Sequence, residues 1–148
     1  MSIIANKYSK SIVEKEQLSR CGAVIFNKNF KKVLLVKNNY CFKWGFPKGS
    51  SLPFEDRKSC AIREVKEETG INLNNQGEIL NFLKIDSCYY FVVHLKDKVK
   101  FDIEDKVEIC DVKFIPINKI PDLYSNRSLK SFYTKYKNNI KDLTSLKI

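Results

Sequence analysis

The sequence lacks a long hydrophobic run, and histidine, tryptophan and methionine each occur once. Nowhere do about 20 apolar residues follow one another, which is the length that a membrane-spanning helix needs. The first twenty residues, Met1 to Arg20, mix Lys, Glu, Ser and Asn and have no apolar segment of the kind that signal peptides carry. We therefore expect a cytoplasmic protein with no membrane partner.

The five cysteines are scattered, and none belongs to a Cys-x-x-Cys pair. Their odd number and wide spacing argue against a disulfide framework and against a zinc site, so we expect no disulfide partner. The single histidine, His94, lies in an apolar run, which argues against a serine–histidine–aspartate triad and against a poly-histidine metal site. If the chain is an enzyme, carboxylates are the catalytic groups at its disposal.

Lysine is what the sequence has in excess. With 27 basic and 17 acidic residues the net charge is +10, which favours polyanionic partners such as nucleic acid or phosphate-rich ligands. Lys, Asn and Ile are abundant throughout, so composition bias is the alternative explanation. Hydrophobic residues make up 43% of the chain, enough for a core. The absence of repeats and linkers indicates a single domain over residues 1–148, and the absence of a coiled-coil seam indicates a monomer.

Hydrophobic patterning predicts an α/β layered domain. Apolar runs indicate strands at residues 21–26, 33–37, 79–85, 89–95 and 107–115, a short aromatic strand or turn at 42–46, and a loop at 47–49. Residues 55–69 contain no Gly or Pro and are followed by Gly70, which predicts a helix with a glycine C-cap. Apolar residues spaced by three and four predict a terminal amphipathic helix over about 126–143.

The helix at 55–69 carries three carboxylates close together. At about 100° per residue, Glu64, Glu67 and Glu68 fall within a sector of about 100°. Such neighbours repel one another unless a divalent cation lies among them, and hard oxygen ligands suit Mg²⁺ or Mn²⁺. Arg63 is placed to orient one of the carboxylates through a charged hydrogen bond. A solvated acidic face is the alternative, but acidic clustering in so basic a chain indicates a metal site.

The spacing of these residues resembles the Nudix box, G-x5-E-x7-R-E-U-x-E-E-x-G-U, in which U is aliphatic. Every constrained position is matched, and the matching residues are Gly49, Glu55, Arg63, Glu64, Val65, Glu67, Glu68, Gly70 and Ile71. The chain therefore resembles the Nudix hydrolases. The resemblance implies an α/β/α sandwich around a mixed β-sheet, and hydrolysis of a nucleoside diphosphate linked to another group.

The same resemblance assigns roles within the box. It implies that Glu64, Glu67 and Glu68 bind the Mg²⁺ or Mn²⁺ cofactor and that the carbonyl oxygen of Gly49 is a further ligand. Glu55 and Arg63 would brace the loop and the helix, with Arg63 counted among the catalytic residues because it orients a carboxylate. Which carboxylate accepts the proton varies within the family.

Segments around the box resemble the Nudix domain of the mRNA-decapping enzymes. They are WGFPKG at 44–49 and CAIREV at 60–65, and the likeness extends over residues 20–121. It implies hydrolysis of capped RNA to 7-methylguanosine diphosphate and RNA with a 5′-monophosphate. The alternatives are hydrolysis of diadenosine tetraphosphate, hydrolysis of diphosphoinositol polyphosphate, and RNA binding without catalysis.

Two further groups of residues follow from the decapping likeness. In those relatives a glutamate of a late strand faces the metals, and Glu108 is our candidate for this ligand or general base. Glu104 and Asp105, in the preceding loop, are the alternatives. The relatives also hold the RNA backbone with a basic C-terminal helix, so we expect RNA contacts from Lys130, Lys137 and Lys141, and a contact from Lys48 to the cap phosphates.

One departure from the decapping pattern limits what can be carried over. Those enzymes normally have a helical N-terminal regulatory domain that binds an activator and helps to hold the cap base, whereas few residues precede the first expected strand here. Neither the activator nor the usual cap-stacking aromatic residue can be assigned. We expect Trp44 to be a core residue. The candidates for stacking on a base are Tyr40, Phe54, Tyr89 and Tyr90, for each of which packing is the alternative.

Overall fold

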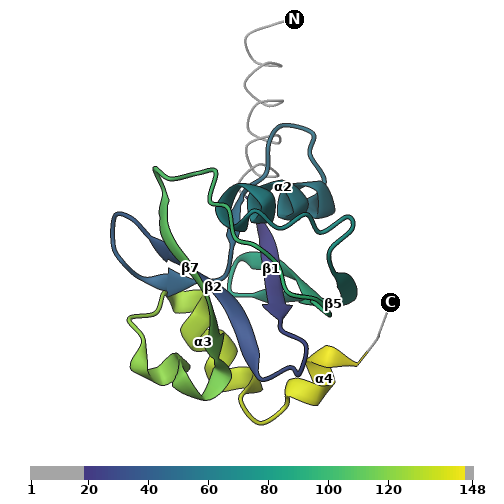
Figure 1. The fold of residues 1–148 in the computed structure, drawn as a ribbon, viewed down its shortest axis with the longest axis vertical. Helices are drawn as coiled ribbons and strands as arrows, with labels where there is room; N and C mark the ends of the chain where they lie inside the picture. The colour runs from purple at the N-terminus through teal and green to yellow at the C-terminus, as the bar shows by residue number, and fades with distance from the viewer. Residues whose placement is uncertain (1–18, 146–148) are drawn as a thin grey trace, which may run out of the picture.

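The computed structural model describes residues 19–145, in which a mixed β-sheet lies between helices (Figure 1). Along the sheet the strands run β3-β2-β1-β6-β5, while β4 pairs with β1 and β7 with β2. The β1–β6 pair is parallel and the other pairs are antiparallel. The strands are β1 (Arg20–Phe26), β2 (Lys32–Asn38), β3 (Trp44–Gly45), β4 (Lys48–Ser50), β5 (Glu78–Ile85), β6 (Cys88–His94) and β7 (Ile109–Pro116).

Different helices cover the two faces of the sheet. Successive side chains of a strand point to opposite faces, and in β1 the side chains of Ala23 and Ile25 pack with helix α2 (Arg57–Thr69). Val24 and Phe26 pack instead with α3 (Arg127–Tyr136) and α4 (Ile140–Thr144). A 3₁₀ helix, η1 (Ile117–Asp122), leads from β7 towards α3. This arrangement confirms the α/β sandwich around a mixed sheet that the sequence predicts.

Local signals account for the limits of α2. The side chain of Asp56 accepts a hydrogen bond from the Ser59 N–H at 2.7 Å, so Asp56 is the N-cap and the helix begins two residues later than residue 55. At the other end Gly70 takes the left-handed conformation, with φ of 84°, and its N–H donates to the carbonyl of Lys66. The predicted glycine C-cap is confirmed.

The expectation of a loop at residues 47–49 is wrong for Lys48 and Gly49, which belong to β4. β4 pairs with the start of β1, with Gly22 opposite Lys48. A Cβ atom at Gly22 would collide with the carbonyl of Pro47 and with Lys48, so this close pairing requires glycine. The strand has three residues and none is β-branched, which is why its sequence gives no strand signal.

The single terminal helix expected over about 126–143 is also wrong, because the chain forms two helices there. α3 has Asn126 as its N-cap and ends at Tyr136, and α4 begins at Ile140. Asn138 and Asn139 lie in the break, and asparagine is a poor residue for a helix interior. Lys141 therefore lies on a different helix from Lys130. Within residues 19–145, none of the helices has the length and apolar character needed to span a bilayer.

Candidate active site

The guanidinium of Arg63 joins the start of the box to the helix. Its Nε and Nη2 atoms each donate to a different carboxylate oxygen of Glu55 at 2.9 Å, and Nη2 also donates to the carbonyl of Ser50 at 2.9 Å. The Glu55 carboxylate in turn accepts the N–H of Leu52. These bonds raise the pKa of Arg63 and lower the pKa of Glu55. The geometry is the one that a bracing role for Glu55 and Arg63 requires.

The same arginine orients two box carboxylates. Its Nη1 atom lies 2.8 Å from Oε1 of Glu64 and 3.4 Å from Oε1 of Glu67. Glu64 is buried, and its burial raises the pKa of its carboxyl group. Glu67 is the more exposed of the two, with 38% of its side chain accessible. Arg63 therefore brings Glu64 and Glu67 together on one side of α2.

The third box carboxylate, Glu68, is the most deeply buried, with an exposure of 2%. Its Oε1 atom accepts the backbone N–H of Lys48 at 3.1 Å, and burial raises its pKa to about 9. No lysine or arginine of the described residues lies within salt-bridge distance of it. A carboxylate buried in this way is costly unless a cation compensates its charge, which is the environment that a metal ligand has.

Gly49 allows backbone and carboxylate to meet. A Cβ atom at this position would collide with the carboxylate of Glu64, so a side chain on Gly49 would displace that group. The carbonyl of Gly49 accepts a long hydrogen bond from the Cys60 thiol at 3.5 Å. The predicted backbone ligand and the predicted carboxylate ligand thus lie next to each other.

Glu108, the residue directly before β7, lies close to the box. It is half-buried, and burial together with the neighbouring Asp105 raises its pKa. Its charge also acts on Glu64 and Glu68, and it lines a pocket with Glu68. Asp105 accepts the Glu108 N–H at 3.1 Å. Glu104 is the alternative that the structure places elsewhere, since its side chain pairs with Lys66 at 2.8 Å on the exposed surface.

The donor set fits a hard divalent cation. Glu64, Glu67, Glu68 and Glu108 offer carboxylate oxygens, and Gly49 offers a carbonyl oxygen, which are the ligand types that Mg²⁺ and Mn²⁺ prefer. Over residues 19–145, no three acidic, histidine or cysteine side chains already converge closely enough to hold an ion. Arg63 is the group that balances the charges of Glu64 and Glu67 in this conformation.

Beside Glu68 and Glu108 lies a pocket of about 290 Å³ with a strongly basic lining. Four cationic residues contribute to it, namely Arg20, Lys43, Lys48 and Arg127. Sequence reasoning found Lys48 and missed the other three, because they come from β1, the turn before β3 and the start of α3. Arginine itself was a usable signal, since the chain has only four arginines and three of them, including Arg63, lie at this site.

Lys48 lines this pocket, and its ammonium group lies beside two neutral polar side chains. Its Nζ atom lies 3.5 Å from Oγ of Ser128 and 3.6 Å from Sγ of Cys88. Burial lowers the pKa of Lys48, and no carboxylate of residues 19–145 lies within 4 Å of its Nζ atom. Within the described residues the Lys48 ammonium therefore contacts two neutral side chains and forms no ion pair.

The predicted RNA-contacting lysines lie on the C-terminal helices. Lys130 and Lys137 are exposed, and with Arg127 they occupy a sector of about 80° on α3. Lys137 is the C-cap of that helix, and its Nζ atom lies 5.6 Å from the centre of the Tyr133 ring. Lys141 is exposed on α4, beyond the break. Arg127, Lys130 and Lys137 thus form a basic stripe on α3, and this stripe begins in the pocket with Arg127.

The four aromatic candidates for base stacking have different environments. Tyr90 is fully buried and packs against Phe46, so it is a core residue. Tyr89 is covered by the guanidinium of Arg57, 3.7 Å from its ring centre. Phe54 and Tyr40 are exposed by 93% and 70%, respectively.

Trp44 is half-buried and packs against the edge of the hydrophobic core, so it supports the core without being enclosed in it.

The NUDIX domain family matches residues 17–136, and the chain belongs to the Nudix family. Such enzymes are pyrophosphatases that generally need divalent cations, and this class agrees with the carboxylates and the basic pocket described above.

Three relatives show how far the likeness extends. The m7GpppN-mRNA hydrolase of Saccharomyces cerevisiae is 36% identical over 122 residues, which cover 74% of this chain and 12% of the yeast protein. Nudix hydrolase 7 of Arabidopsis thaliana is 34% identical over 124 residues, covering 75% of this chain and 43% of that protein. The crystal structure of a Caenorhabditis elegans Ap4A hydrolase shares the fold, with a TM-score of 0.68 at 23% identity, and the match covers 84% of this chain and 98% of that one.

Proposed function

We propose that this Nudix hydrolase decaps mRNA. It cleaves the triphosphate bridge of capped RNA, releasing 7-methylguanosine diphosphate and leaving a 5′-monophosphate on the RNA. The observation that carries the proposal is the 36% identity to the yeast m7GpppN-mRNA hydrolase over 74% of the chain. The basic pocket supports it, because a triphosphate bridge needs several cations beside the metal-binding carboxylates.

The acidic residues divide the catalytic work among them. Glu64, Glu67, Glu68 and Glu108, with the carbonyl of Gly49, would hold Mg²⁺ or Mn²⁺, which when bound neutralises phosphate oxygens and activates a water. Arg63 fixes the orientation of Glu64 and Glu67, and the Lys48 N–H fixes that of Glu68. Glu108 comes from the segment before β7, whereas the other three glutamates lie on α2. It is our candidate for accepting the proton of the attacking water.

The basic residues bind the substrate. Lys48 neutralises phosphate oxygens of the cap in the pocket, helped by Arg20 and Arg127. Lys130 and Lys137 on α3, and Lys141 on α4, contact the RNA backbone as it leaves the pocket. We propose that the protein works as a monomer in the cytoplasm, where capped RNA is its partner.

The experiment that tests this function compares substrates with the purified protein. Cap-labelled RNA, diadenosine tetraphosphate and a diphosphoinositol polyphosphate are each incubated with Mg²⁺ or Mn²⁺, and the products are separated. We expect release of labelled 7-methylguanosine diphosphate, with a kcat/KM above that for either small substrate, and no release in the presence of a chelator.

Each alternative gives a different result in that assay. Faster cleavage of a small substrate with capped RNA untouched would replace decapping by small-molecule hydrolysis and keep the Nudix mechanism. Retention of RNA in a gel shift with no metal-dependent product from any substrate would identify a binding protein without catalysis. Both results would contradict the proposal.

A further inference from the structure

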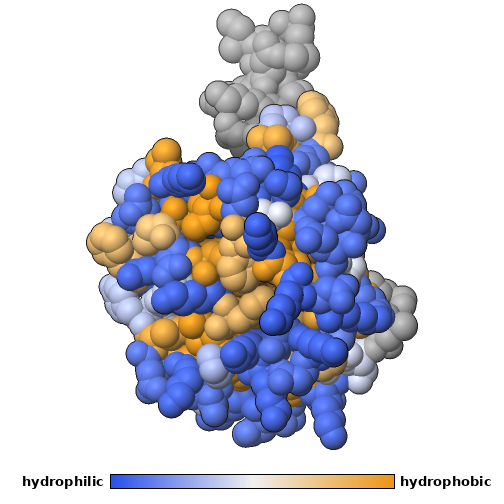
Figure 2. Space-filling view, in the orientation of Figure 1, coloured by the Kyte–Doolittle hydropathy of each residue, from blue (hydrophilic) through white to orange (hydrophobic). Residues whose placement is uncertain are grey.

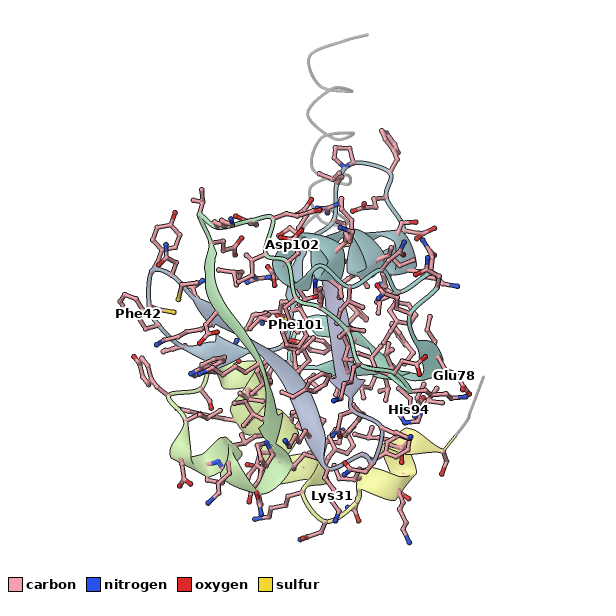
Figure 3. All side chains as sticks on the ribbon, in the orientation of Figure 1. Lys31, Phe42, Glu78, His94, Phe101 and Asp102 are labelled. Carbon is pink, nitrogen blue, oxygen red and sulfur yellow. The ribbon has the colours of Figure 1, made fainter. Side chains whose placement is uncertain are left out.

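A second pocket, which we call the distal pocket, lies at the end of the molecule away from the candidate active site. It has a volume of about 780 Å³, and residues of three segments line it, namely 29–32, 116–118 and 133–140. β4 pairs with the start of β1, whereas residues 29–32 follow its end, and the seven residues of β1 span about 20 Å. Figure 3 labels Lys31 at the end of the molecule opposite α2. The distal pocket is therefore separate from the carboxylates of the box.

The floor of the distal pocket is apolar. Four half-buried residues pack on the hydrophobic core and also line the pocket, namely Phe30, Ile117, Tyr133 and Ile140. They come from the turn after β1, from η1, from α3 and from α4. Apolar surface that stays open inside a polar rim is typical of a site that binds another molecule.

The rim of the distal pocket is cationic. Lys31, Lys32 and Lys137 are exposed and line it, and no aspartate or glutamate belongs to its lining. Within residues 19–145, none of these three lysines has a carboxylate at salt-bridge distance. Figure 2, in the orientation of Figure 1, shows mostly hydrophilic residues over this lower end of the molecule. The charge of the rim therefore complements an acidic partner.

Hydrogen bonds and ring stacking hold the walls of the distal pocket in place. The N–H of Ile117 donates to the carbonyl of Lys31 at 3.0 Å, which joins two of the three segments. The Asn27 side chain accepts the N–H of Lys32 at 2.9 Å. The Phe30 ring stacks on the ring of His94, with 4.1 Å between the ring centres. A pocket formed in advance loses little conformational entropy when a ligand binds.

The chemistry of the distal pocket suits a peptide better than a nucleic acid. Asn118 and Asn138 are exposed on its rim, and an amide side chain both donates and accepts hydrogen bonds, as a peptide backbone does. His94 already covers one face of the Phe30 ring. Ile117 and Ile140 are aliphatic, so they offer no π face to a base and suit an apolar side chain.

We propose that the distal pocket is a docking site for an acidic peptide segment of a partner protein. An apolar side chain of the segment packs on Phe30, Ile117 and Ile140, and flanking carboxylates pair with Lys31 and Lys32. The apolar contact gives affinity and the charges select acidic sequences. This docking site goes beyond the proposed function, because it holds whichever substrate the box carboxylates hydrolyse.

The test measures the binding of synthetic peptides to the full chain by fluorescence anisotropy. Short fluorescein-labelled peptides carry a central leucine, phenylalanine or tryptophan between aspartates and glutamates. In one matched set serine replaces the apolar residue, and in another asparagine and glutamine replace the acids. We expect at least one acidic peptide with an apolar centre to bind with a Kd of about 100 μM or lower. Its two matched peptides should bind about 10-fold more weakly, since each lacks one of the two contacts.

Two variants change the pocket at exposed residues. Lys31→Glu/Lys32→Glu makes two attractive charges repulsive, and we expect it to raise the Kd of the acidic peptide about 10-fold or more. Asn138→Trp adds bulk to the rim without changing the charge, and we expect a similar loss. The matched control is Lys98→Glu/Lys100→Glu, which reverses the same charge outside the pocket and should leave the Kd within about threefold.

Lys137 stays unchanged in every variant, because it also belongs to the stripe on α3. Urea unfolding of each variant, with the wild-type midpoint expected, shows that the fold is intact.

Several results would overturn the docking site. One is that no acidic peptide with an apolar centre binds. Another is that the serine-centred peptide binds equally well, or that the control variant loses as much affinity as the pocket variants, since net charge would then explain the binding. A labelled oligouridylate tests for RNA: if it binds more tightly than the peptides and is lost in both pocket variants, the pocket is an RNA site instead. None of these results depends on which substrate the enzyme hydrolyses.

Discussion

Glu68 is only 2% exposed, and its carboxylate accepts one backbone hydrogen bond, from the N–H of Lys48. Folding alone gives no reason to bury a carboxylate there, since the desolvation of its charge is unfavourable. A glutamine would keep the oxygen that accepts the Lys48 N–H and would remove the charge. Stability and activity should therefore respond to this substitution in opposite ways.

We expect Glu68→Gln to lower kcat by two orders of magnitude or more, because an amide is a poor ligand for a hard cation. Without metal, its urea midpoint should equal or exceed that of the wild type. Steady-state hydrolysis and urea unfolding in a chelator measure the two effects. An unchanged kcat would remove Glu68 from the metal site, and a large loss of stability would mean that its role is structural.

Arg63 makes a planar network that a lysine cannot reproduce, with Glu55 on one side and Glu64 on the other. We expect Arg63→Lys to lower stability by about 1–2 kcal/mol, because the partly buried Glu55 loses its paired bonds, and to lower kcat about 10-fold or more, because Glu64 is no longer held. The control is Lys66→Ala, which removes an exposed pair with Glu104 and should change stability by less than about 1 kcal/mol. Equal effects in the two variants would contradict the bracing role.

At the scale of elements, α2 depends on its left-handed terminal residue. Gly70 has φ of 84°, and a Cβ atom there would meet the backbone of Asp102, whose N–H donates to the carbonyl of Thr69. We expect Gly70→Ala to lower the free energy of unfolding by about 1–3 kcal/mol, from the strained φ and this contact. Urea unfolding measures it, with Lys58→Ala on the exposed face of α2 as the control, expected within about 0.5 kcal/mol of the wild type. A Gly70→Ala protein as stable as the control would contradict the role of the cap.

The elements that the sequence predicts well are those whose signals are local. The cap residues Asp56 and Gly70 lie within a few positions of the helix that they limit, and the box carboxylates share one helix. β4 depends instead on pairing with β1, which no pattern within residues 48–50 reveals. The basic pocket is harder still, because Arg20 and Arg127 come from opposite ends of the described chain and only the fold brings them together. Glu108 could be inferred only from the family likeness.

On the C-terminal side of the molecule, basic residues form a line along α3. The net charge of +10 would attract any polyanion, but Arg127, Lys130 and Lys137 form a stripe that begins in the pocket and follows α3. A long RNA whose cap occupies the pocket can reach this stripe, and a cap dinucleotide cannot extend along it. General attraction and a defined RNA path therefore predict different dependence on substrate length.

We expect the triple variant Lys130→Ala/Lys137→Ala/Lys141→Ala to raise KM for long capped RNA about 10-fold and to leave that for a cap dinucleotide within about twofold. The matched control is Lys58→Ala/Lys98→Ala/Lys100→Ala, which removes the same charge from exposed lysines elsewhere. Because each lost phosphate contact flattens the salt dependence of single-strand binding by about 0.7, the first triple should lower the slope of log Kd against log salt by about 2. If both triples weaken long RNA equally, net charge alone explains the attraction, and α3 is not the path of the RNA.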